Sequence, residues 1–281
     1  MIRISDKSDI IGIINLWREA FGDSENEILF FLDNRYKPEN TLVAEENGKI
    51  ASMLFLLEGK MKINGICYPS FYLYAACTLK EFRGKGLMAS LLKFAKETAS
   101  DRNIDFICLL PAEESLYKFY ESHNYKTVFS KKVYVFSREN IADSTLNKEL
   151  FCNLEETRNK AFEDIDMFKW DNDSLDFAFE HNSFYGGQAL IGNNGYALFN
   201  VTEQDVYIKE CTLTDEVEAV VSTILNKYPD INKIVVDLPV GIKTAYNNYE
   251  IVDSGMALAV SKKAEILIDE IKDAYLGLTL N

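Results

Sequence analysis

Residues 74–92 read YAACTLKEFRGKGLMASLL: an apolar run, a short charged loop with two glycines, and then a helical pattern. A strand–loop–helix junction of this kind presents free backbone N–H groups at the positive end of the helix dipole, which together bind phosphate. Gly84 and Gly86 lack a Cβ and let the backbone approach a ligand, while Arg83 and Lys85 add positive charge. The stretch therefore predicts an anion-binding loop.

The loop narrows the choice of phosphate ligand. It contains neither G-x-x-x-x-G-K-[ST] nor G-x-G-x-x-G, which disfavours a P-loop NTPase and a dinucleotide-binding site. It resembles the acyl-CoA loop of GNAT-superfamily N-acetyltransferases, R/Q-x-x-G-x-G/A, with Met88 in place of the last small residue. Taken alone, the loop is also compatible with an ordinary strand-to-helix turn whose charges are solvated.

Composition excludes several classes of protein. Hydrophobic residues make up 47% and charged residues 26% of the 281 residues, as in globular proteins, and no apolar stretch reaches the ~18 residues of a membrane span. The start of the chain lacks an apolar signal region and the five cysteines form no C-x-x-C pair, which predicts a cytoplasmic protein with reduced thiols. The presence of only two histidines, far apart, argues against a metal site.

The net charge of −14 argues against nucleic acid as a partner, because phosphate backbones are bound by clustered Lys and Arg. It is compatible with a cationic acceptor, although acidity is also a common route to solubility. The sequence leaves the oligomeric state open.

Periodicity predicts the elements of the first half. The expected strands and helices, in order, are strand 1–5, helices 9–21 (with Ser8 as N-cap) and 25–36, strands 41–44, 50–57 and 70–78, helix 87–100, strand 104–110, helix 114–122 and a final strand 128–136. The order βααβββαβαβ is that of the GNAT fold. A second motif, LYKFYESHNY at residues 116–125, is similar to the F-Y-E-K-x-G-F/Y segment of the family, with Asn124 at the usual glycine. The resemblance thus covers residues 1–138.

The second half repeats the pattern without the loop. Strand 206–213, helix 217–228 and strand 233–239 correspond to the strand, helix and strand around the glycine loop, and residues 246–249 and 257–260 match the later segments. Thr214-Asp215-Glu216 stands opposite residues 80–86, so the glycines and cations are replaced by two acids. Chance similarity between two βαβ segments is the alternative.

Two domains are therefore predicted: a catalytic GNAT domain at 1–138 and a degenerate GNAT-like domain at 151–281, joined by a polar linker. The fold class is α/β (α+β), with a mixed, mostly antiparallel sheet flanked by helices. This tandem resembles the enhanced-intracellular-survival acetyltransferases, some of which acetylate cationic amines. The chain is too short for their sterol-carrier-like third domain and ends in a predicted helix at 264–275.

The resemblance implies an acetyl-CoA cosubstrate and no metal. The residues expected to hold the cofactor are the pantetheine-pairing strand and the pyrophosphate loop: Ala76, Cys77, Thr78, Arg83, Gly84, Lys85, Gly86, Leu87 and Met88. Tyr120 matches the general acid for the leaving thiolate, with Tyr117 as its nearest competitor. A tyrosine that only packs the helix onto the sheet is the alternative.

No general base stands out, because the strand at 70–78 lacks a carboxylate; water or the terminal carboxylate of Asn281 would take the proton. Trp17, Phe21, Tyr72 and Tyr74 either line a substrate cleft or belong to the core. The expected activity is acetyl transfer to a primary amine of a small molecule or peptide. The alternatives are a non-catalytic acyl-CoA sensor or scaffold and a nucleotide-binding module.

Overall fold

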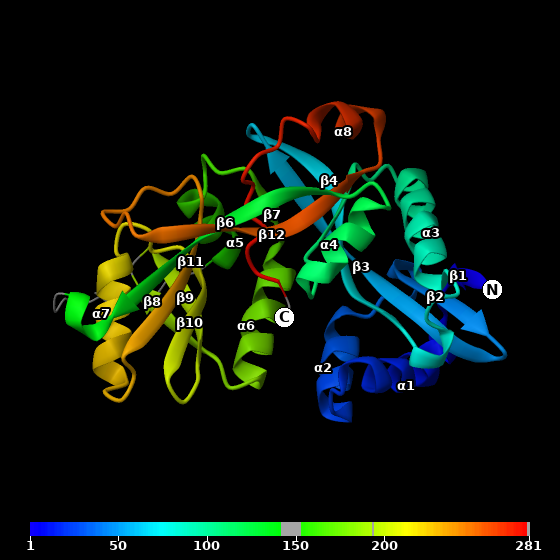
Figure 1. Ribbon diagram of the computed structural model, residues 1–281, viewed down its shortest axis with the longest axis horizontal. Helices are drawn as coiled ribbons and strands as arrows, with labels where there is room; N and C mark the ends of the chain where they lie inside the picture. Colours follow the sequence, from blue (N-terminus) through cyan, green and yellow to red (C-terminus); the bar gives the residue numbers. More distant parts are fainter. Residues whose placement is uncertain (142–152, 193, 280–281) are drawn as a thin grey trace. The chain divides into compact units, whose positions relative to one another are not determined.

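The computed structural model describes residues 1–141, 153–192 and 194–279, and Figure 1 labels its elements. The chain folds into two compact units, each built from three separate segments. Unit 1 comprises residues 1–60, 68–126 and 256–270, and unit 2 comprises residues 61–67, 127–255 and 271–281. The prediction divides the chain into two consecutive domains, with boundaries at 138 and 151. Each observed unit instead contains segments from both halves of the chain.

Unit 1 is built mainly from the first nine elements of the chain. They are β1 (Ile2–Ile4), α1 (Ile10–Phe21), α2 (Glu25–Arg35), β2 (Thr41–Glu46), β3 (Lys49–Ile63), β4 (Ile66–Thr78), α3 (Leu87–Asp101), β5 (Phe106–Leu109) and α4 (Glu114–Glu121). Three 3-10 turns accompany them, at Lys7–Asp9, Pro38–Asn40 and Lys80–Phe82. The predicted element types are confirmed, with ends shifted by a few residues and β3 clearly longer than expected.

Alternation along β3 explains how helices cover both faces of the unit 1 sheet. Leu54 and Leu56 belong to a buried cluster that also contains residues of α3, whereas the ring of Phe55 between them lies 5.5 Å from that of Trp17 on α1. Because successive side chains of a strand point to opposite faces, one strand serves two helical layers.

The start of α1 differs from the prediction. Ser8 is not its N-cap; instead Asp6 caps the preceding 3-10 turn by accepting from the Ser8 amide at 2.7 Å, and α1 then begins after Asp9. The carboxylate of Asp9 completes the capping box and also pairs with Arg3. The capping box therefore belongs to the 3-10 turn, and α1 itself begins after Asp9 without a side-chain cap.

Unit 2 contains most of the remaining elements. They are β6 (Lys126–Ser137), a 3-10 turn at Arg138–Asn140, α5 (Leu154–Ala161), β7 (Met167–Lys169), α6 (Asn172–Phe184), β8 (Gln188–Gly192), β9 (Gly195–Val201), β10 (Asp205–Cys211), α7 (Val217–Lys227) and β11 (Lys233–Pro239). The chain closes with β12 (Tyr249–Ala259) and α8 (Lys262–Leu267). The polar linker predicted before α5 lies mostly outside the described residues.

The closing strands are exchanged relative to the prediction. The strand predicted at 128–136 exists as β6, but it pairs antiparallel with β11 in unit 2 rather than closing the first domain. The antiparallel partner of β5 in unit 1 is the end of β12, with Met256 opposite Leu109 and Ala259 opposite Phe106. The apolar pattern of a strand defines its two faces but not its neighbour, so this exchange is invisible in the sequence.

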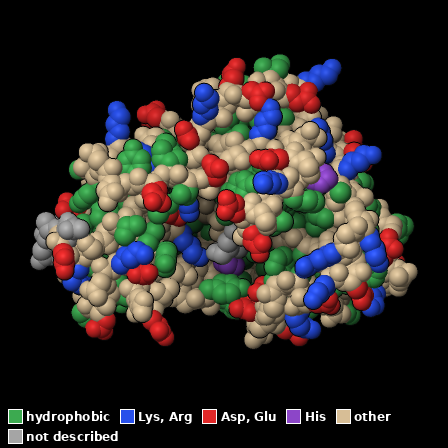
Figure 2. Space-filling model, in the orientation of Figure 1, with side chains coloured by type: hydrophobic (Ala, Val, Ile, Leu, Met, Phe, Trp, Pro, Cys, Tyr) green, Lys and Arg blue, Asp and Glu red, His purple; other side chains and the backbone are tan. Residues whose placement is uncertain are grey.

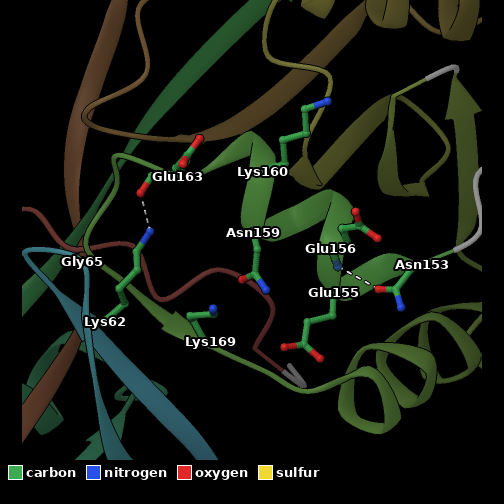
Figure 3. A pocket seen from close by; sticks show the side chains of 9 residues that line it. All are labelled: Lys62, Gly65, Asn153, Glu155, Glu156, Asn159, Lys160, Glu163 and Lys169. Carbon is green, nitrogen blue, oxygen red and sulfur yellow. Dashed lines mark hydrogen bonds between the residues drawn. The ribbon is translucent and has the colours of Figure 1, made fainter.

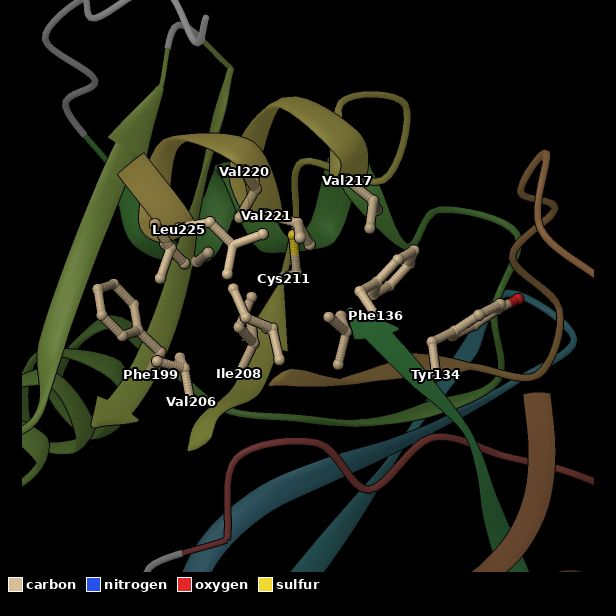
Figure 4. Close-up of a cluster of buried hydrophobic side chains, with 14 of the residues drawn as sticks. Tyr134, Phe136, Phe199, Val206, Ile208, Cys211, Val217, Val220, Val221 and Leu225 are labelled. Carbon is tan, nitrogen blue, oxygen red and sulfur yellow. The ribbon is translucent and has the colours of Figure 1, made fainter. Parts of the chain in front are cut away.

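Unit 2 repeats the central βαβ crossover of unit 1. β10 and β11 are parallel neighbours joined by α7, as β4 and β5 are joined by α3. Val220, Val221 and Leu225 of α7 pack on Val206 and Ile208 of β10 in the buried cluster of Figure 4. Residues 246–248, which the sequence comparison matched to the region of α4, contain no helix.

The final segment also differs from the prediction, which placed a helix at 264–275. α8 ends at Leu267, and Ala274 and Tyr275 instead form isolated parallel bridges with Phe129 and Met167 in unit 2. No helix in the described residues is long and apolar enough to cross a bilayer.

Candidate active site

The first component of the site is the part of β4 that runs past its neighbour. The parallel register joins residues 70–72 of β4 to residues 106–108 of β5, whereas β4 itself continues to Thr78. Tyr74, Ala75 and Ala76 in this extension are half-buried. Such an edge suits an extended ligand that hydrogen-bonds as an added strand does.

A backbone irregularity lies within this extension. Ala75 has a φ of 48°, in the left-handed region that residues with a Cβ seldom adopt. Beyond it the strand is fixed from β3, because the Ser52 hydroxyl donates to the Cys77 carbonyl at 2.8 Å and lies 2.8 Å from Thr78 Oγ1. Strain of this kind persists where the surrounding structure holds it, and it is common at functional sites.

Both glycines of the loop adopt left-handed backbone conformations. Gly84 and Gly86 have φ values of 76° and 75°, and a Cβ built on either would meet nothing within 4 Å. Backbone conformation therefore accounts for these glycines, and the space over both is open. Gly86 is the N-cap of α3 without a side-chain cap, so the first N–H groups of that helix remain for a ligand.

The two cations of the loop are exposed and held only loosely. Arg83 donates from Nε to the Thr78 carbonyl at 3.1 Å, and Lys85 Nζ lies 4.6 Å from the centroid of the Phe82 ring. The neighbouring Cys77 does not suit the role of a nucleophile, because its thiol is buried and burial raises the pKa of that thiol.

Tyr120 lies near the end of α4, and the residue is 7% exposed. Burial raises the pKa of Tyr120 to about 12, and its ring contacts that of Tyr125 at a centroid distance of 5.4 Å. The apolar cluster that contains Tyr120 also has Ala76, Leu87 and Met88 packed against it. The structure thus brings the predicted acid together with part of the predicted cofactor loop.

The raised pKa has a consequence for the pH profile. The neutral phenol is the proton donor, so a pKa near 12 keeps Tyr120 competent at higher pH than the usual value of about 10 would. We expect no alkaline fall in kcat from this group up to about pH 10.5. A pH–rate profile at saturating substrates checks this; a basic limb at about pH 9–10 that disappears in Tyr120→Phe would contradict it.

The aromatic residues left open by the sequence fall into two groups. Trp17 and Tyr72 are buried core residues, whereas Phe21 is 46% exposed and Tyr74 is half-buried. The sequence missed Phe31, whose ring lies 5.0 Å from the rings of both Trp17 and Tyr74. Phe31 follows Ile28 on α2 at helical spacing, a pattern that predicts a core position and gives no indication of a functional site.

Tyr117, the nearest competitor of Tyr120 in the sequence, is half-buried on α4 and packs against the same apolar cluster as Tyr120. The candidate base at Asn281, and Cys152 among the cysteines, lie outside the described residues.

Comparison with protein families decides the class of the first half. Residues 1–128 match the model of the acetyltransferase (GNAT) domain. These residues form a GNAT acetyltransferase domain. The match covers the β4 extension, the glycine loop and Tyr120, so the family predicted from the loop is confirmed for this part of the chain.

Solved structures extend the likeness beyond the GNAT domain. A probable N-acyltransferase of unknown function from Enterococcus faecalis V583 is 13% identical with a TM-score of 0.74, covering 94% of this chain and 73% of its own. A GCN5-related N-acetyltransferase from Anabaena variabilis is 16% identical with a TM-score of 0.74, and the match covers 97% of this chain and 75% of that one. Eis1 from Mycobacterium abscessus is 13% identical with a TM-score of 0.67, and the match covers 94% of this chain and 75% of that one. The predicted mixed α/β fold is thereby confirmed over both halves. No curated protein matches the chain.

Charge is distributed without a large basic surface on the face that Figure 2 presents. Lys and Arg side chains there are interspersed with Asp and Glu side chains. The net charge of the chain is −14.

Proposed function

We propose that the GNAT domain transfers the acetyl group of acetyl-CoA to a primary amine. The observation that carries the proposal is the open glycine loop at the start of α3, beside a β4 edge that runs past β5. Phosphate groups bind at such helix starts through backbone N–H groups. An extended pantetheine arm fits the strand edge.

The proposed cofactor contacts follow from these two features. Backbone groups of Ala76, Cys77 and Thr78 would pair with the pantetheine, and the loop from Arg83 to Met88 would hold the pyrophosphate. The exposed, weakly held side chains of Arg83 and Lys85 support this assignment, because neither forms an ion pair with a carboxylate among the described residues. Both can turn toward a phosphate.

The proposed reaction is direct. The amine nitrogen attacks the thioester carbon, the C–S bond breaks, and the CoA thiolate takes the proton of the Tyr120 hydroxyl. The amine proton leaves to water, which also returns a proton to Tyr120. Direct attack needs no nucleophile from the protein, and the raised pKa of the buried Cys77 thiol is consistent with that.

The decisive experiment is a screen for CoA release with acetyl-CoA and polyamines, aminoglycosides, peptide N-termini or lysine as acceptors. Release above the rate without acceptor is expected for at least one class, with acetylated amine found by mass spectrometry. Acetyl-CoA binding with no release for any acceptor would instead support a non-catalytic acyl-CoA sensor. Stabilisation by ATP or NAD but not acetyl-CoA would point to a nucleotide module.

Reversing the loop charge should weaken cofactor binding. We expect the double change Arg83→Glu and Lys85→Glu to raise the Kd for acetyl-CoA at least ~10-fold, because two attractive charges near the phosphates become repulsive. Calorimetric titration measures it. Lys93→Glu, on the helix that follows the loop, is the control, since Lys93 is 80% exposed and pairs weakly with Glu97 at 3.9 Å. Equal Kd values for the loop variant and this control would refute the loop assignment.

We further propose that the second half is a degenerate GNAT-like domain with no cofactor site of its own. The turn between β10 and α7 holds Asp215 and Glu216 where the first half has glycines and cations. Carboxylates at a helix start occupy the position that phosphate would take and repel it. The same titration should therefore give one acetyl-CoA per chain.

A further inference from the structure

Unit 2 contains a polar cavity that no part of the acetyl-transfer proposal uses. Its volume is about 760 Å³, within the range of small-molecule sites, and Figure 3 shows its lining from close by. The walls come from the turn between β3 and β4, from α5 and its flanks, and from β7. Six of the lining residues are charged: Lys62, Lys160, Lys169, Glu155, Glu156 and Glu163.

These three positive and three negative charges line one cavity without neutralising one another. Within the described residues, none of the six forms an ion pair within 4.0 Å. In Figure 3 the only dashed bond to a lining lysine runs from Lys62 to Glu163, and the acceptor there is a backbone carbonyl. The cavity therefore presents unpaired charges of both signs.

Lys62 is the most constrained of them. Its side chain is 7% exposed, and Nζ donates to the carbonyls of Phe162 at 2.8 Å and Glu163 at 2.7 Å, where α5 ends. These bonds fix its position and occupy two of the three N–H donors of an ammonium group. Burial lowers the pKa of Lys62 and the positive charge of Lys169 lowers it further, whereas Asp166 and Asp164 raise it. Because neither lysine forms an ion pair among the described residues, Lys62 and Lys169 together offer positive charge to an anionic group of a ligand.

The carboxylates decide what kind of anion. Figure 3 shows Asn159 and Lys169 pointing toward each other, with the Glu155 carboxylate beyond them on the side away from Lys62. A simple anion would leave Glu155 without an oppositely charged group. A molecule with a carboxylate at one end and an ammonium at the other can pair with the two lysines and with Glu155. The Asn159 amide can donate to the first group and accept from the second.

We propose that this cavity binds a small zwitterion of the free amino-acid type. Its carboxylate lies against Lys62 and Lys169, and its ammonium group against Glu155. The site belongs to unit 2 alone and does not depend on the acetyl-transfer proposal. It gives unit 2 a binding function of its own.

The test is direct binding to the full chain in the absence of acetyl-CoA. The probes are the common L-amino acids, titrated by calorimetry, followed by the amine and the acid that each lack one charged group of the best binder. We expect at least one amino acid to bind with a Kd below about 1 mM, and both analogues at least ~10-fold more weakly. No saturation by any amino acid at about 10 mM, or equal binding of either analogue, would overturn the proposal.

Variants locate the binding. Lys169→Gln removes a half-buried charge from the cavity and should raise the Kd at least ~10-fold, while Lys243→Gln removes an exposed charge of the same unit outside the cavity and should leave it unchanged. Lys62→Met provides a second variant, with its fold checked by circular dichroism. Binding that survives Lys169→Gln unchanged would place the amino acid elsewhere, for example in an acceptor site, and would equally overturn the proposal.

Discussion

Tyr120→Phe is expected to lower kcat at least ~10-fold while the Kd for acetyl-CoA stays within about twofold. The change removes one hydroxyl and keeps the ring that packs against Tyr125 at 5.4 Å, so the buried cluster around α4 should remain intact. Without the phenol, the thiolate must leave unprotonated or wait for water. Steady-state kinetics with the best acceptor, together with calorimetric titration of acetyl-CoA, separates the two quantities.

Tyr117→Phe is the matched control for this experiment. It removes a hydroxyl from the same helix at a half-buried position one turn earlier, and turnover should fall by less than about twofold. If Tyr117→Phe causes the larger loss, the acid is assigned to the wrong tyrosine. Unchanged turnover in both variants would leave protonation of the thiolate to water.

The acidity of Tyr120 also indicates how it works. With a pKa of about 12, the phenol is a weaker acid than a thiol, whose ordinary pKa is about 8.5. Complete proton transfer to a fully formed thiolate is thus uphill by roughly 3–4 pKa units, or about 5 kcal/mol. Tyr120 contributes most by donating a hydrogen bond while charge builds on sulfur, with the proton following as the C–S bond breaks.

The backbone of the glycine loop and of the turn after α4 could be predicted from sequence because its conformation is local, whereas the roles of the loop and of Tyr120 stay predictions. Gly84 and Gly86 adopt left-handed φ values that side chains disfavour, so glycine at those positions carries direct information on the backbone. Asn124, with a φ of 67°, gives the same information at the end of α4. Helices and strands were likewise visible in the spacing of apolar residues, which depends only on near neighbours in the chain.

Long-range pairing could not be predicted, as the exchanged strands show. β6 and β12 each carry an apolar pattern that suits either sheet, and the choice between β5 and β11 depends on packing between segments that lie far apart in the chain. The cavity of unit 2 could not be predicted for the same reason, because residues that are far apart in the sequence form it. Lys62 and Lys169 come from opposite sides of the predicted domain boundary, and nothing near either one in the sequence indicates the other.

The buried ion pair of unit 2 is a further contact between distant residues that the sequence concealed. Arg158 on α5 is 1% exposed and donates from Nε to both carboxylate oxygens of Glu210 at 3.1 Å, with Glu210 fully buried on β10. Tyr196 donates to Glu210 Oε1 at 2.6 Å, and Arg158 Nη1 donates to the Phe168 carbonyl at 3.0 Å. A Cβ on Gly277 would lie 2.4 Å from Arg158 Nη2, so the chain passes directly over the pair.

Arg158→Met should therefore cost about 3–5 kcal/mol of unfolding free energy, because it leaves the Glu210 carboxylate buried without its partner. Urea denaturation measures the loss. Lys233→Met is the control, because it breaks the more exposed pair with Asp205, at 3.7 Å in the same unit, and should cost less than about 1 kcal/mol.

Adding Glu210→Leu to Arg158→Met should recover part of the loss, because the double variant leaves no buried charge. A loss below about 1 kcal/mol for Arg158→Met alone would mean that water reaches Glu210. The pair would then contribute little to stability, and the half of the chain that lacks the cofactor loop would depend on its apolar core alone.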